Sequence, residues 1–254
     1  MSEHVRVERG GGVLAITLAR PERRNAITVT MYAALAQAIE GAADDPSIRL
    51  VLLRGEGVDF TAGNDLADFL AAPPSGEDVP VWRLLRALAV NEVPIVAAVQ
   101  GNAVGIGTTM LFHCDLVLAE EGCRFVMPFV DLGLVPEAAS SLLLPQLAGR
   151  RAAARHLLLG EPFGATEALA MGLASHVVAK GKLAGALERV TTALLAKPAE
   201  ALRLTQRLLR KGDRDAVLER MALENDHFSE RLTSDEVKQA ITDFFKERSP
   251  ESSR

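Results

Sequence analysis

AAVQGNAVGIGTTMLFHCDLVLAE, residues 97–120, is the stretch of the sequence that decides the fold. The apolar run PIVAAVQG (94–101) leads into it and is typical of a strand buried on both faces of a sheet. After a glycine-rich turn, GTTMLFHCD (107–115) predicts a buried helix and LVLAE (116–120) predicts another strand. Strand, turn, helix and strand in this order favour a layered domain that mixes α and β structure.

The same kinds of pattern extend toward both ends of this stretch. VRVE (5–8) and VLAITLA (13–19) flank a glycine turn and predict a β-hairpin. Thr28 is placed to cap a helix ending near DDP (44–46), whose buried face has Met31, Leu35 and Ile39. IRLVLLRG (48–55) and CRFVM (123–127) are short apolar runs that predict further strands.

The composition changes from about residue 182, where four segments with helical spacing follow one another. Pro198, Gly212 and Ser234 separate them. We therefore predict a mixed core over residues 1–195 and a helical region over 196–254. Residues 70–80, rich in proline and glycine, predict a mobile loop.

Composition excludes several classes of function. The net charge of −5 argues against a nucleic-acid partner. The absence of a long apolar run argues against a membrane span, and the charged N-terminus MSEHVRVERGGG does not resemble a signal peptide, so we expect a cytoplasmic protein. Cys114 and Cys123 are then expected to be free, buried thiols. No histidine or cysteine spacing indicates a metal site.

Two glycine-bearing turns are candidates for chemistry, and each has a structural alternative. FTAGNDL (60–66) either points a backbone N–H outward after Gly63 or is an ordinary turn in which Asn64 or Asp65 caps a helix. QGNAVGIGTTM (100–110) has Met110 where a dinucleotide fingerprint needs glycine, and it lacks the Gly-Lys-Ser/Thr of a P-loop. An oxyanion site and close helix–sheet packing both remain open for it.

Taken together, these motifs resemble the crotonase family, the enoyl-CoA hydratases and isomerases. The resemblance covers nearly the whole chain and follows five stretches in order: TLARPERRNAIT (17–28), FTAGNDL, AAVQGNAVGIGTTMLFHCDLVLAE, GEPFGATEALAMGLASHVV (160–178) and ITDFFKERSPE (241–251). It implies the crotonase (ClpP-like) spiral, a mixed α/β fold of repeated ββα units forming two sheets. It also implies C-terminal helices that form a homotrimer, or a hexamer that is a dimer of trimers.

The resemblance further implies an acyl-CoA thioester substrate, as in fatty-acid β-oxidation, and no cofactor beyond the coenzyme A of the substrate. The thioester oxygen would bind the backbone N–H groups of Asn64 and Ile106. Removing one such donor typically costs about 3–4 kcal/mol of barrier. By the same resemblance, the coenzyme A moiety would contact Arg24, Ala62, Asp65, Leu66 and Phe244.

The sequence departs from the family at the two positions where its hydratases have glutamates. Thr109 and Phe129 occupy them here, and neither can act as a carboxylate base. LGLVPE (132–137) resembles the isomerase branches, in which a single acid shifts a double bond, so Glu137 is the predicted catalytic acid. Apolar neighbours Leu134 and Val135 would raise its pKa. The structural alternative is that Glu137 caps a following helix.

Other acids and other activities remain open at this point. Asp131 is the second-choice acid, although a turn or surface position suits it better. His113 and Asp115 are expected to be structural, and Ser140 and Ser141 to be helix-capping hydroxyls, because no serine-hydrolase motif surrounds them. The predicted function is conversion of a 3-enoyl-CoA to a trans-2-enoyl-CoA. The alternatives are a hydratase with a displaced acid, a ring-type isomerase of the epoxyphenylacetyl-CoA kind and a non-catalytic acyl-CoA binder.

Overall fold

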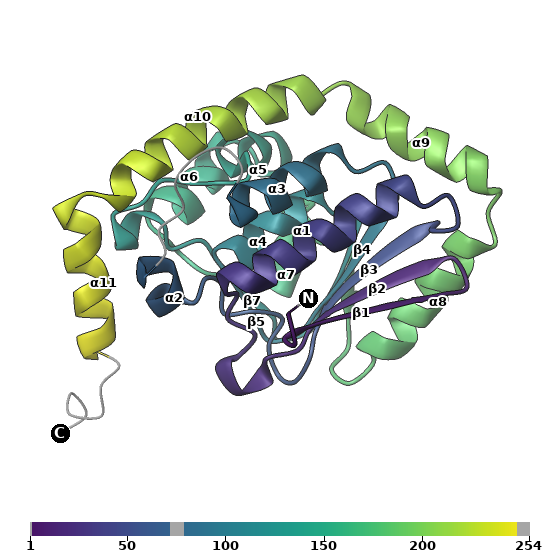
Figure 1. Cartoon of the computed structure of the whole chain (residues 1–254), viewed down its shortest axis with the longest axis horizontal. Coiled ribbons are helices and arrows are strands. Elements are labelled where there is room, and N and C mark those ends of the chain that lie inside the picture. The colour runs from purple at the N-terminus through teal and green to yellow at the C-terminus, as the bar shows by residue number, and fades with distance from the viewer. Residues whose placement is uncertain (1, 72–78, 248–254) are drawn as a thin grey trace.

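A computed structural model describes residues 2–71 and 79–247, except for the side chains of 69–71, 244, 245 and 247 (Figure 1). Its larger sheet has six strands in the order β1-β2-β3-β4-β6-β9. They are β1 (Val5–Gly10), β2 (Val13–Leu18), β3 (Leu50–Gly55), β4 (Ile95–Val99), β6 (Leu116–Glu120) and β9 (His176–Val178). β1 and β2 form the predicted antiparallel hairpin, and every other neighbouring pair is parallel.

The smaller sheet has the order β5-β7-β8, with β5 (Asn102–Val104), β7 (Arg124–Val126) and β8 (Phe163–Gly164). β5 and β7 are parallel, and β8 pairs antiparallel with β7. The strand predicted over 123–127 is therefore confirmed as an element of a second sheet. Because β4 and β5 are separated by only two residues, the chain passes at once from one sheet to the other at Gln100 and Gly101.

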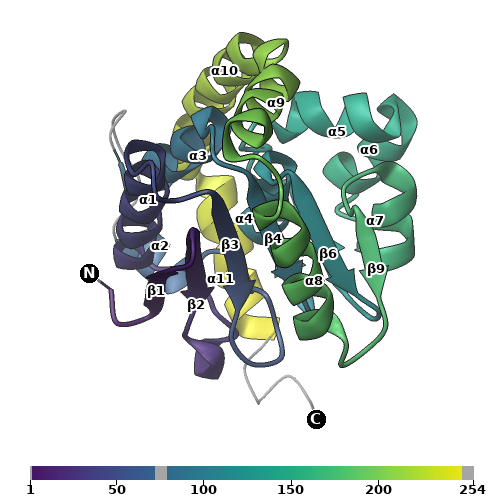
Figure 2. The same ribbon diagram turned by 90° about the vertical axis from the view of Figure 1, so that its right-hand side faces the viewer.

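Alternate residues of the central strands pack into two apolar clusters on the two faces of the larger sheet. Val51 and Leu53 of β3 join the main core, together with residues of α1 (Val29–Asp44) and α3 (Pro80–Val90). Leu50 and Leu52 face the other way and meet Ala186 and Leu187 of α8 (Leu183–Leu195). Figure 2 shows α8 lying across that face of the sheet. Burial on both faces explains why these strands read as continuous apolar runs.

The helices that surround the sheets follow from local signals. Thr28 caps α1, its Oγ1 accepting a hydrogen bond from the Met31 N–H at 3.3 Å, and Met31, Leu35 and Ile39 are buried as predicted. Other helical elements are η1 (Pro21–Arg23), α2 (Leu66–Ala71), η3 (Val130–Leu132), α5 (Ser140–Ala148), α6 (Arg150–Leu158) and α7 (Ala165–Met171). Most of the loop predicted over 70–80, residues 72–78, lies outside the described residues.

The buried helix predicted over 107–115 is present over 106–113, in two parts. A short α4 (Ile106–Thr109) continues as the 3₁₀ segment η2 (Met110–His113), and the chain then straightens. The helix ends early because the Asp115 N–H donates to the Ile95 carbonyl at 2.8 Å, which starts the β4–β6 pairing. A 3₁₀ turn is a common way to end such a helix, since it satisfies carbonyls over three residues.

In the described part of the C-terminal region four helices follow one another, as predicted: α8, α9 (Ala199–Lys211), α10 (Arg214–Leu232) and α11 (Asp235–Glu247). Figure 1 shows α9 and α10 running along one side of the molecule, with α11 turning back at the far end. Phe228 of α10 packs edge-on against Trp82 of α3, with ring centroids 5.6 Å apart. The boundary at residue 195 coincides with the end of α8, and its status as a domain boundary stays a prediction.

Within the described ranges, no helix has the length and apolar character needed to cross a bilayer. Both cysteines are free thiols, as predicted, and burial raises the pKa of each to about 12. Thiols with such pKa values are not reactive nucleophiles near neutral pH.

Candidate active site

The turn that contains Gly63 is held between two other segments of the chain. On one side the Ile27 N–H donates to the Gly63 carbonyl at 2.8 Å, and the Asp65 N–H donates to the Ile27 carbonyl at 2.9 Å. On the other side the Val104 N–H donates to the Thr61 carbonyl at 3.1 Å. Gly63 has φ of +84°, and a Cβ there would lie 2.7 Å from the Val104 carbonyl oxygen. Glycine is thus required for this approach.

The start of α4 lies against the same turn. A Cβ on Gly107 would lie 2.4 Å from Cγ2 of Thr61, so this glycine lets the helix pack against FTAGNDL. Gly105, with φ of 54°, precedes the helix and makes Ile106 its first residue, whose N–H has no partner within the helix. Among the described residues, neither the Asn64 nor the Ile106 N–H donates a hydrogen bond. Two neighbouring free donors of this kind can bind a developing oxyanion.

Glu137 is buried, with 1% of its surface exposed. Its Oε1 accepts a hydrogen bond from Oγ1 of Thr109 at 3.3 Å, and its Oε2 has no partner within the described residues. Burial raises the pKa of Glu137 to about 8, the nearby charge of Glu224 raises it as well, and the Thr109 hydrogen bond opposes them. A carboxyl group with one free oxygen and a pKa near neutrality is suited to accept and return a proton.

The turn after Glu137 has an unusual backbone. Ala138 and Ala139 have φ of 59° and 55°, in the left-handed region that residues with a Cβ rarely adopt. The N–H and Oγ of Ser140 both donate to the Glu137 carbonyl, at 2.9 and 2.6 Å. Ala139 is the N-cap of α5, so the prediction that the two serine hydroxyls cap this helix is wrong.

Glu224 of α10 satisfies the helix start instead. Its Oε2 accepts from the Ala139 N–H at 2.6 Å and its Oε1 from the Ser141 N–H at 3.0 Å. Glu137 therefore does not serve as the cap, because this position is filled from another helix. The expectation that His113 and Asp115 are structural agrees with their contacts. Nε2 of His113 meets the Ala138 carbonyl at 2.9 Å, and Asp115 Oδ2 accepts from the Ile95 N–H at 2.7 Å.

Two residues of the site were not predicted from the sequence. One is Glu224; the other is Tyr32 of α1, whose hydroxyl donates to Oδ1 of Asn64. Burial, together with the charge of Glu137, raises the pKa of Tyr32 well above its usual value, so the phenol stays protonated. The available signal for Tyr32 was that it is the only tyrosine in the chain and lies beside Met31 in the predicted helix.

Of the residues predicted to contact coenzyme A, Arg24, Ala62 and Leu66 lie near Asn64, whereas Phe244 belongs to α11. Arg24 has a side chain that is 66% exposed, with Nε 3.8 Å from Asp59, and its carbonyl accepts from the Ala62 N–H at 2.9 Å. The structure thus brings Arg24 and Ala62 together, with Asn64 only two residues further along. Leu66 begins α2 beside them. Phe244 falls in α11, and its side chain lies outside the described residues.

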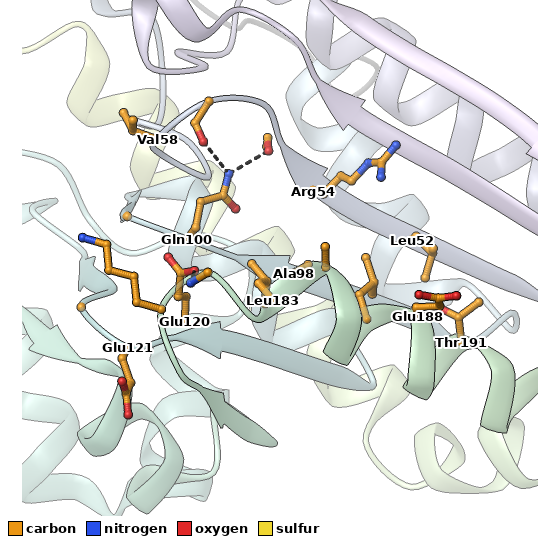
Figure 3. Close-up of a pocket in the computed structure, with 18 of the residues that line it drawn as sticks. Leu52, Arg54, Val58, Ala98, Gln100, Glu120, Glu121, Leu183, Glu188 and Thr191 are labelled. Atoms are coloured by element: carbon orange, nitrogen blue, oxygen red, sulfur yellow. Dashed lines mark hydrogen bonds between the residues drawn. The ribbon is translucent and has the colours of Figure 1, made fainter.

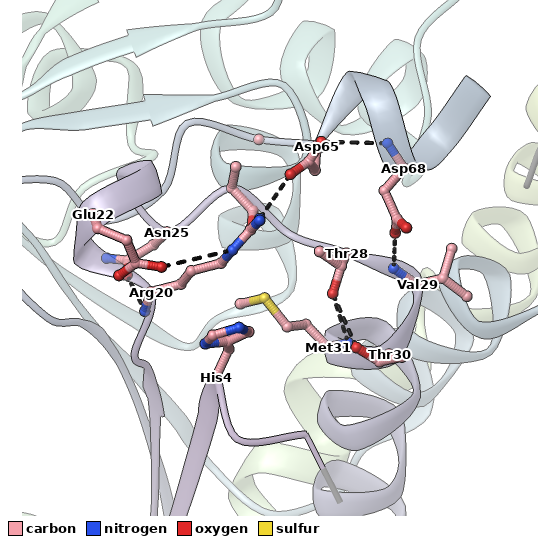
Figure 4. A network of polar contacts seen from close by, with 12 residues as sticks. His4, Arg20, Glu22, Asn25, Thr28, Val29, Thr30, Met31, Asp65 and Asp68 are labelled. Carbon is pink, nitrogen blue, oxygen red and sulfur yellow. Dashed lines mark hydrogen bonds and ion pairs between the residues drawn. The ribbon is translucent and has the colours of Figure 1, made fainter. Parts of the chain in front are cut away.

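Asp65 has internal partners, which Figure 4 shows. It pairs with Arg20 at 2.7 Å, and its Oδ1 accepts from the Asp68 N–H at 3.3 Å, which caps α2. Although burial opposes ionisation, hydrogen bonds from Arg20 and from the Asp68 backbone lower the pKa of Asp65. Asp65 therefore caps a helix, which is the structural alternative considered for it. Any contact with coenzyme A would be additional to these internal contacts.

Neither Phe129 nor Asp131 provides a second buried acid. Phe129 is buried in the main apolar core. Asp131 is exposed on η3, with its carboxylate beside Gly160.

A separate cavity of about 800 Å³ lies between α8 and the ends of β3, β4 and β6 (Figure 3). Arg54, Gln100, Glu120 and Glu188 line it, and Gln100 donates to the carbonyls of Gly55 and Gly57. Glu137, Asn64 and Ile106 are not among its lining residues. This cavity is therefore distinct from the candidate active site.

Comparison with known proteins gives consistent matches along the chain. The family model for enoyl-CoA hydratase/isomerase matches residues 8–253. The 1,2-epoxyphenylacetyl-CoA isomerase of Escherichia coli (strain K12) is 33% identical over 94% of both chains. The enoyl-CoA delta isomerase 2 of Homo sapiens is 32% identical over 94% of this chain, which spans 62% of that protein. The 2,3-dehydroadipyl-CoA hydratase of E. coli (strain K12) is 30% identical over 99% of this chain and 98% of its own.

Solved structures agree with these matches. The crystal structure of an enoyl-CoA hydratase/isomerase from Pseudoalteromonas atlantica T6c has a TM-score of 0.91 at 40% identity, covering 98% of this chain and 99% of that one. The predicted spiral fold, with two mixed sheets and C-terminal helices, is thereby confirmed. The similar proteins include isomerases and a hydratase, so their names alone do not select one reaction.

Proposed function

The chain belongs to the enoyl-CoA hydratase/isomerase (crotonase) family and is an acyl-CoA enzyme of that family, and we propose that its reaction is a double-bond shift carried out by Glu137. In this reaction a 3-enoyl-CoA becomes a trans-2-enoyl-CoA. The observation that carries the proposal is the state of the Glu137 carboxyl group. It is a buried acid with one unpartnered oxygen, and threonine and phenylalanine stand where a hydratase would have its two glutamates.

The proposed mechanism needs one base and one oxyanion site. Ionised Glu137 removes a proton from C2 of the 3-enoyl thioester, and the electrons move into the thioester carbonyl to form a dienolate. The N–H groups of Asn64 and Ile106 bind the negative oxygen. Protonated Glu137 then returns a proton to C4, and the double bond ends between C2 and C3. One carboxyl group therefore serves both transfers, and it is regenerated at the end.

Hydration is less well supported, because adding water needs one group to deprotonate the water and another to protonate carbon. The second acid close to Glu137 is Glu224, and both of its oxygens accept backbone hydrogen bonds. Its carboxylate is thus occupied in holding the start of α5. A ring-type isomerisation is the second candidate, favoured by the 33% identity over 94% of the chain to the 1,2-epoxyphenylacetyl-CoA isomerase.

Recognition of coenzyme A is proposed to use Arg24, whose exposed guanidinium can pair with a phosphate, together with the neighbouring Ala62, Asp65 and Leu66. Phe244 stays a prediction from the family resemblance. A homotrimer, or a dimer of trimers, also stays a proposal. Exposed leucines on α9 support it, because apolar side chains on one helix favour burial against another subunit. They are Leu204, Leu208 and Leu209.

The test is turnover of a 3-enoyl-CoA in deuterated buffer by the wild type, Glu137→Gln and the control Asp131→Asn. We expect Glu137→Gln to lose about 10²- to 10⁴-fold in kcat while acyl-CoA binding measured by calorimetry survives. Asp131→Asn should keep wild-type turnover. Loss of activity in Asp131→Asn with retention in Glu137→Gln would move the base to Asp131. Formation of a 3-hydroxyacyl-CoA from a 2-enoyl-CoA would establish the hydratase alternative instead.

A further inference from the structure

We propose that Glu224 of α10 is a positioning residue for Glu137, and that it holds the turn that carries the catalytic acid from a distant part of the sequence. The inference rests on the proposed function of Glu137. It goes beyond that function by giving the C-terminal helices a part in catalysis, in addition to any part in assembly.

The turn needs an external constraint because its own backbone is strained. Ala138 and Ala139 follow Glu137 directly, and both have φ in the left-handed region, at 59° and 55°. A Cβ makes this region unfavourable, and two consecutive residues in it are rarer still. Such a conformation persists only where the surrounding contacts impose it. The contacts around this turn therefore decide where the Glu137 side chain points.

Glu224 supplies the contacts on one side. It is buried, with 5% of its surface exposed, although it lies 85 positions from Ala139 in the chain. One oxygen accepts from the Ala139 N–H at 2.6 Å and the other from the Ser141 N–H at 3.0 Å. Arg220, one turn earlier on α10, donates to Oγ of Ser141 at 3.1 Å. Both oxygens of one carboxylate thus fix the residues on either side of Ser140.

His113 supplies the contact on the other side. Burial lowers the pKa of His113 to about 4, so the ring is neutral near pH 7 and Nε2 can donate to the Ala138 carbonyl at 2.9 Å. Arg210 of α9 donates in turn to the His113 carbonyl and, at 2.7 Å, to the Leu88 carbonyl. Two successive C-terminal helices therefore reach the same turn, one directly and one through η2.

The charge of Glu224 also acts on Glu137. Burial raises the pKa of Glu224, whereas the hydrogen bonds from Ser141 and Ala139 and the charge of Arg220 favour its carboxylate. The ionisable groups that face the turn are Tyr32 from α1, His113 from η2, and Arg220 and Glu224 from α10. Of these, Tyr32 and His113 are neutral near pH 7, and Glu224 is the acid whose charge raises the pKa of Glu137.

The experiment compares wild type with Glu224→Gln, Glu224→Ala and the control Glu219→Gln, an exposed glutamate five positions earlier on α10. Glutamine keeps the shape and one acceptor oxygen but removes the charge, so it tests the proposal even if the alanine variant does not fold. Protein labelled with ¹³C at the glutamate carboxyl carbons reports the protonation of Glu137 directly, with Glu137→Gln used to assign its signal. The dependence of kcat and kcat/KM on pH is measured in parallel.

In Glu224→Gln we expect the pKa of Glu137 to fall by about one, because a neighbouring negative charge is lost. We also expect the plateau kcat to fall by about 10-fold, with KM nearly unchanged, because the turn loses one charge-assisted hydrogen bond. Glu219→Gln should match the wild type in both. A Glu224→Gln enzyme that loses only thermal stability, with unchanged Glu137 titration and plateau kcat, would overturn the proposal. The carboxyl titration does not depend on turnover, so it separates this outcome from a failure of the proposed isomerase function.

Discussion

Oγ1 of Thr109 donates a hydrogen bond to Oε1 of Glu137 across 3.3 Å, which joins α4 to the strained turn before α5. By the family resemblance, Thr109 occupies a position at which hydratases have a glutamate. The threonine at this position therefore donates a hydrogen bond to the proposed catalytic acid, Glu137. Because the hydroxyl stabilises the ionised carboxylate, it partly offsets the effect of burial on the pKa of Glu137.

This contact predicts a change in the pH dependence of Thr109→Val, which keeps the shape of the side chain and removes the hydroxyl. Glu137 must be ionised to act as base, so kcat/KM of the wild type should rise with pH through a pKa of about 8. In the variant the rise should move to higher pH by roughly half to one pH unit, since one hydrogen bond to the carboxylate is lost. Thr108→Val, at the adjacent buried threonine, is the control. If the rise in kcat/KM of Thr109→Val moved to lower pH, it would contradict the assignment of this pKa to Glu137.

The oxyanion site predicts the behaviour of Ile106→Pro. Ile106 is the first residue of α4, where proline is tolerated, and the preceding Gly105 is the residue least restricted by a following proline. The substitution removes one proposed donor, so kcat should fall by about 10²- to 10³-fold while acyl-CoA still binds.

Ile106→Ala is the matched control, because it truncates the buried side chain and retains the N–H. Steady-state kinetics and circular dichroism on both variants make the comparison. Equal losses in the alanine and proline variants would assign the effect to packing and not to the N–H.

Arg24 should affect substrate affinity and not chemistry. Its exposed guanidinium is proposed to meet a phosphate of coenzyme A, so Arg24→Gln should raise KM for acyl-CoA by roughly 5- to 20-fold with little change in kcat. An acyl-pantetheine substrate lacks that phosphate, and on it the variant and the wild type should agree. Arg23→Gln, an exposed neighbour, is the control. The same rise in KM on both substrates would argue against a phosphate contact.

The raised pKa of Glu137 also predicts how stability depends on pH. In the unfolded chain this carboxyl ionises near its ordinary value of 4.5, and in the folded protein it ionises near 8. Between these values the unfolded state binds fewer protons, so the free energy of unfolding falls as pH rises, by on the order of several kcal/mol in total. Below pH 4.5 this loss is absent.

Glu137→Gln lacks this ionisation, and its melting temperature relative to the wild type should therefore increase from pH 5 to about pH 8 and then level off. Calorimetry at four or five pH values measures the difference, and Asp131→Asn provides the exposed-acid control. A constant difference across this range would show that Glu137 titrates normally in the folded protein.

Local patterns predicted much of the fold. The continuous apolar runs of β3 and β4 indicated strands buried on both faces, and the two clusters around Leu52 and Leu53 explain why. Thr28 and the spacing of Met31 and Leu35 predicted α1. The helix predicted over 107–115 ends two residues early, because its end is set by pairing between β4 and β6, a contact between distant segments that no local spacing encodes.

In the candidate site, too, some residues could be predicted from local motifs and others could not. Glu137, Asn64 and Ile106 belong to motifs, and the direction of the Glu137 pKa followed from its apolar neighbours. Glu224 lies in a helix with many charged residues, where its spacing does not distinguish it from a surface acid. Tyr32 meets Asn64 across 32 positions. Both become part of the site only through tertiary contacts, so the sequence pattern contained no signal for their partners.

The reach of α9 and α10 to the turn after Glu137 has a consequence for the timing of activity during synthesis. A ribosome that has translated residues 1–200 has already made Asn64, Ile106 and Glu137, but the groups that hold the turn, Arg210 and Glu224, do not yet exist. A nascent chain is therefore expected to carry the proposed reacting groups and still lack a working site until α9 and α10 have emerged and docked. Premature stop codons or proteolytic cleavage before α10 should likewise give an inactive protein.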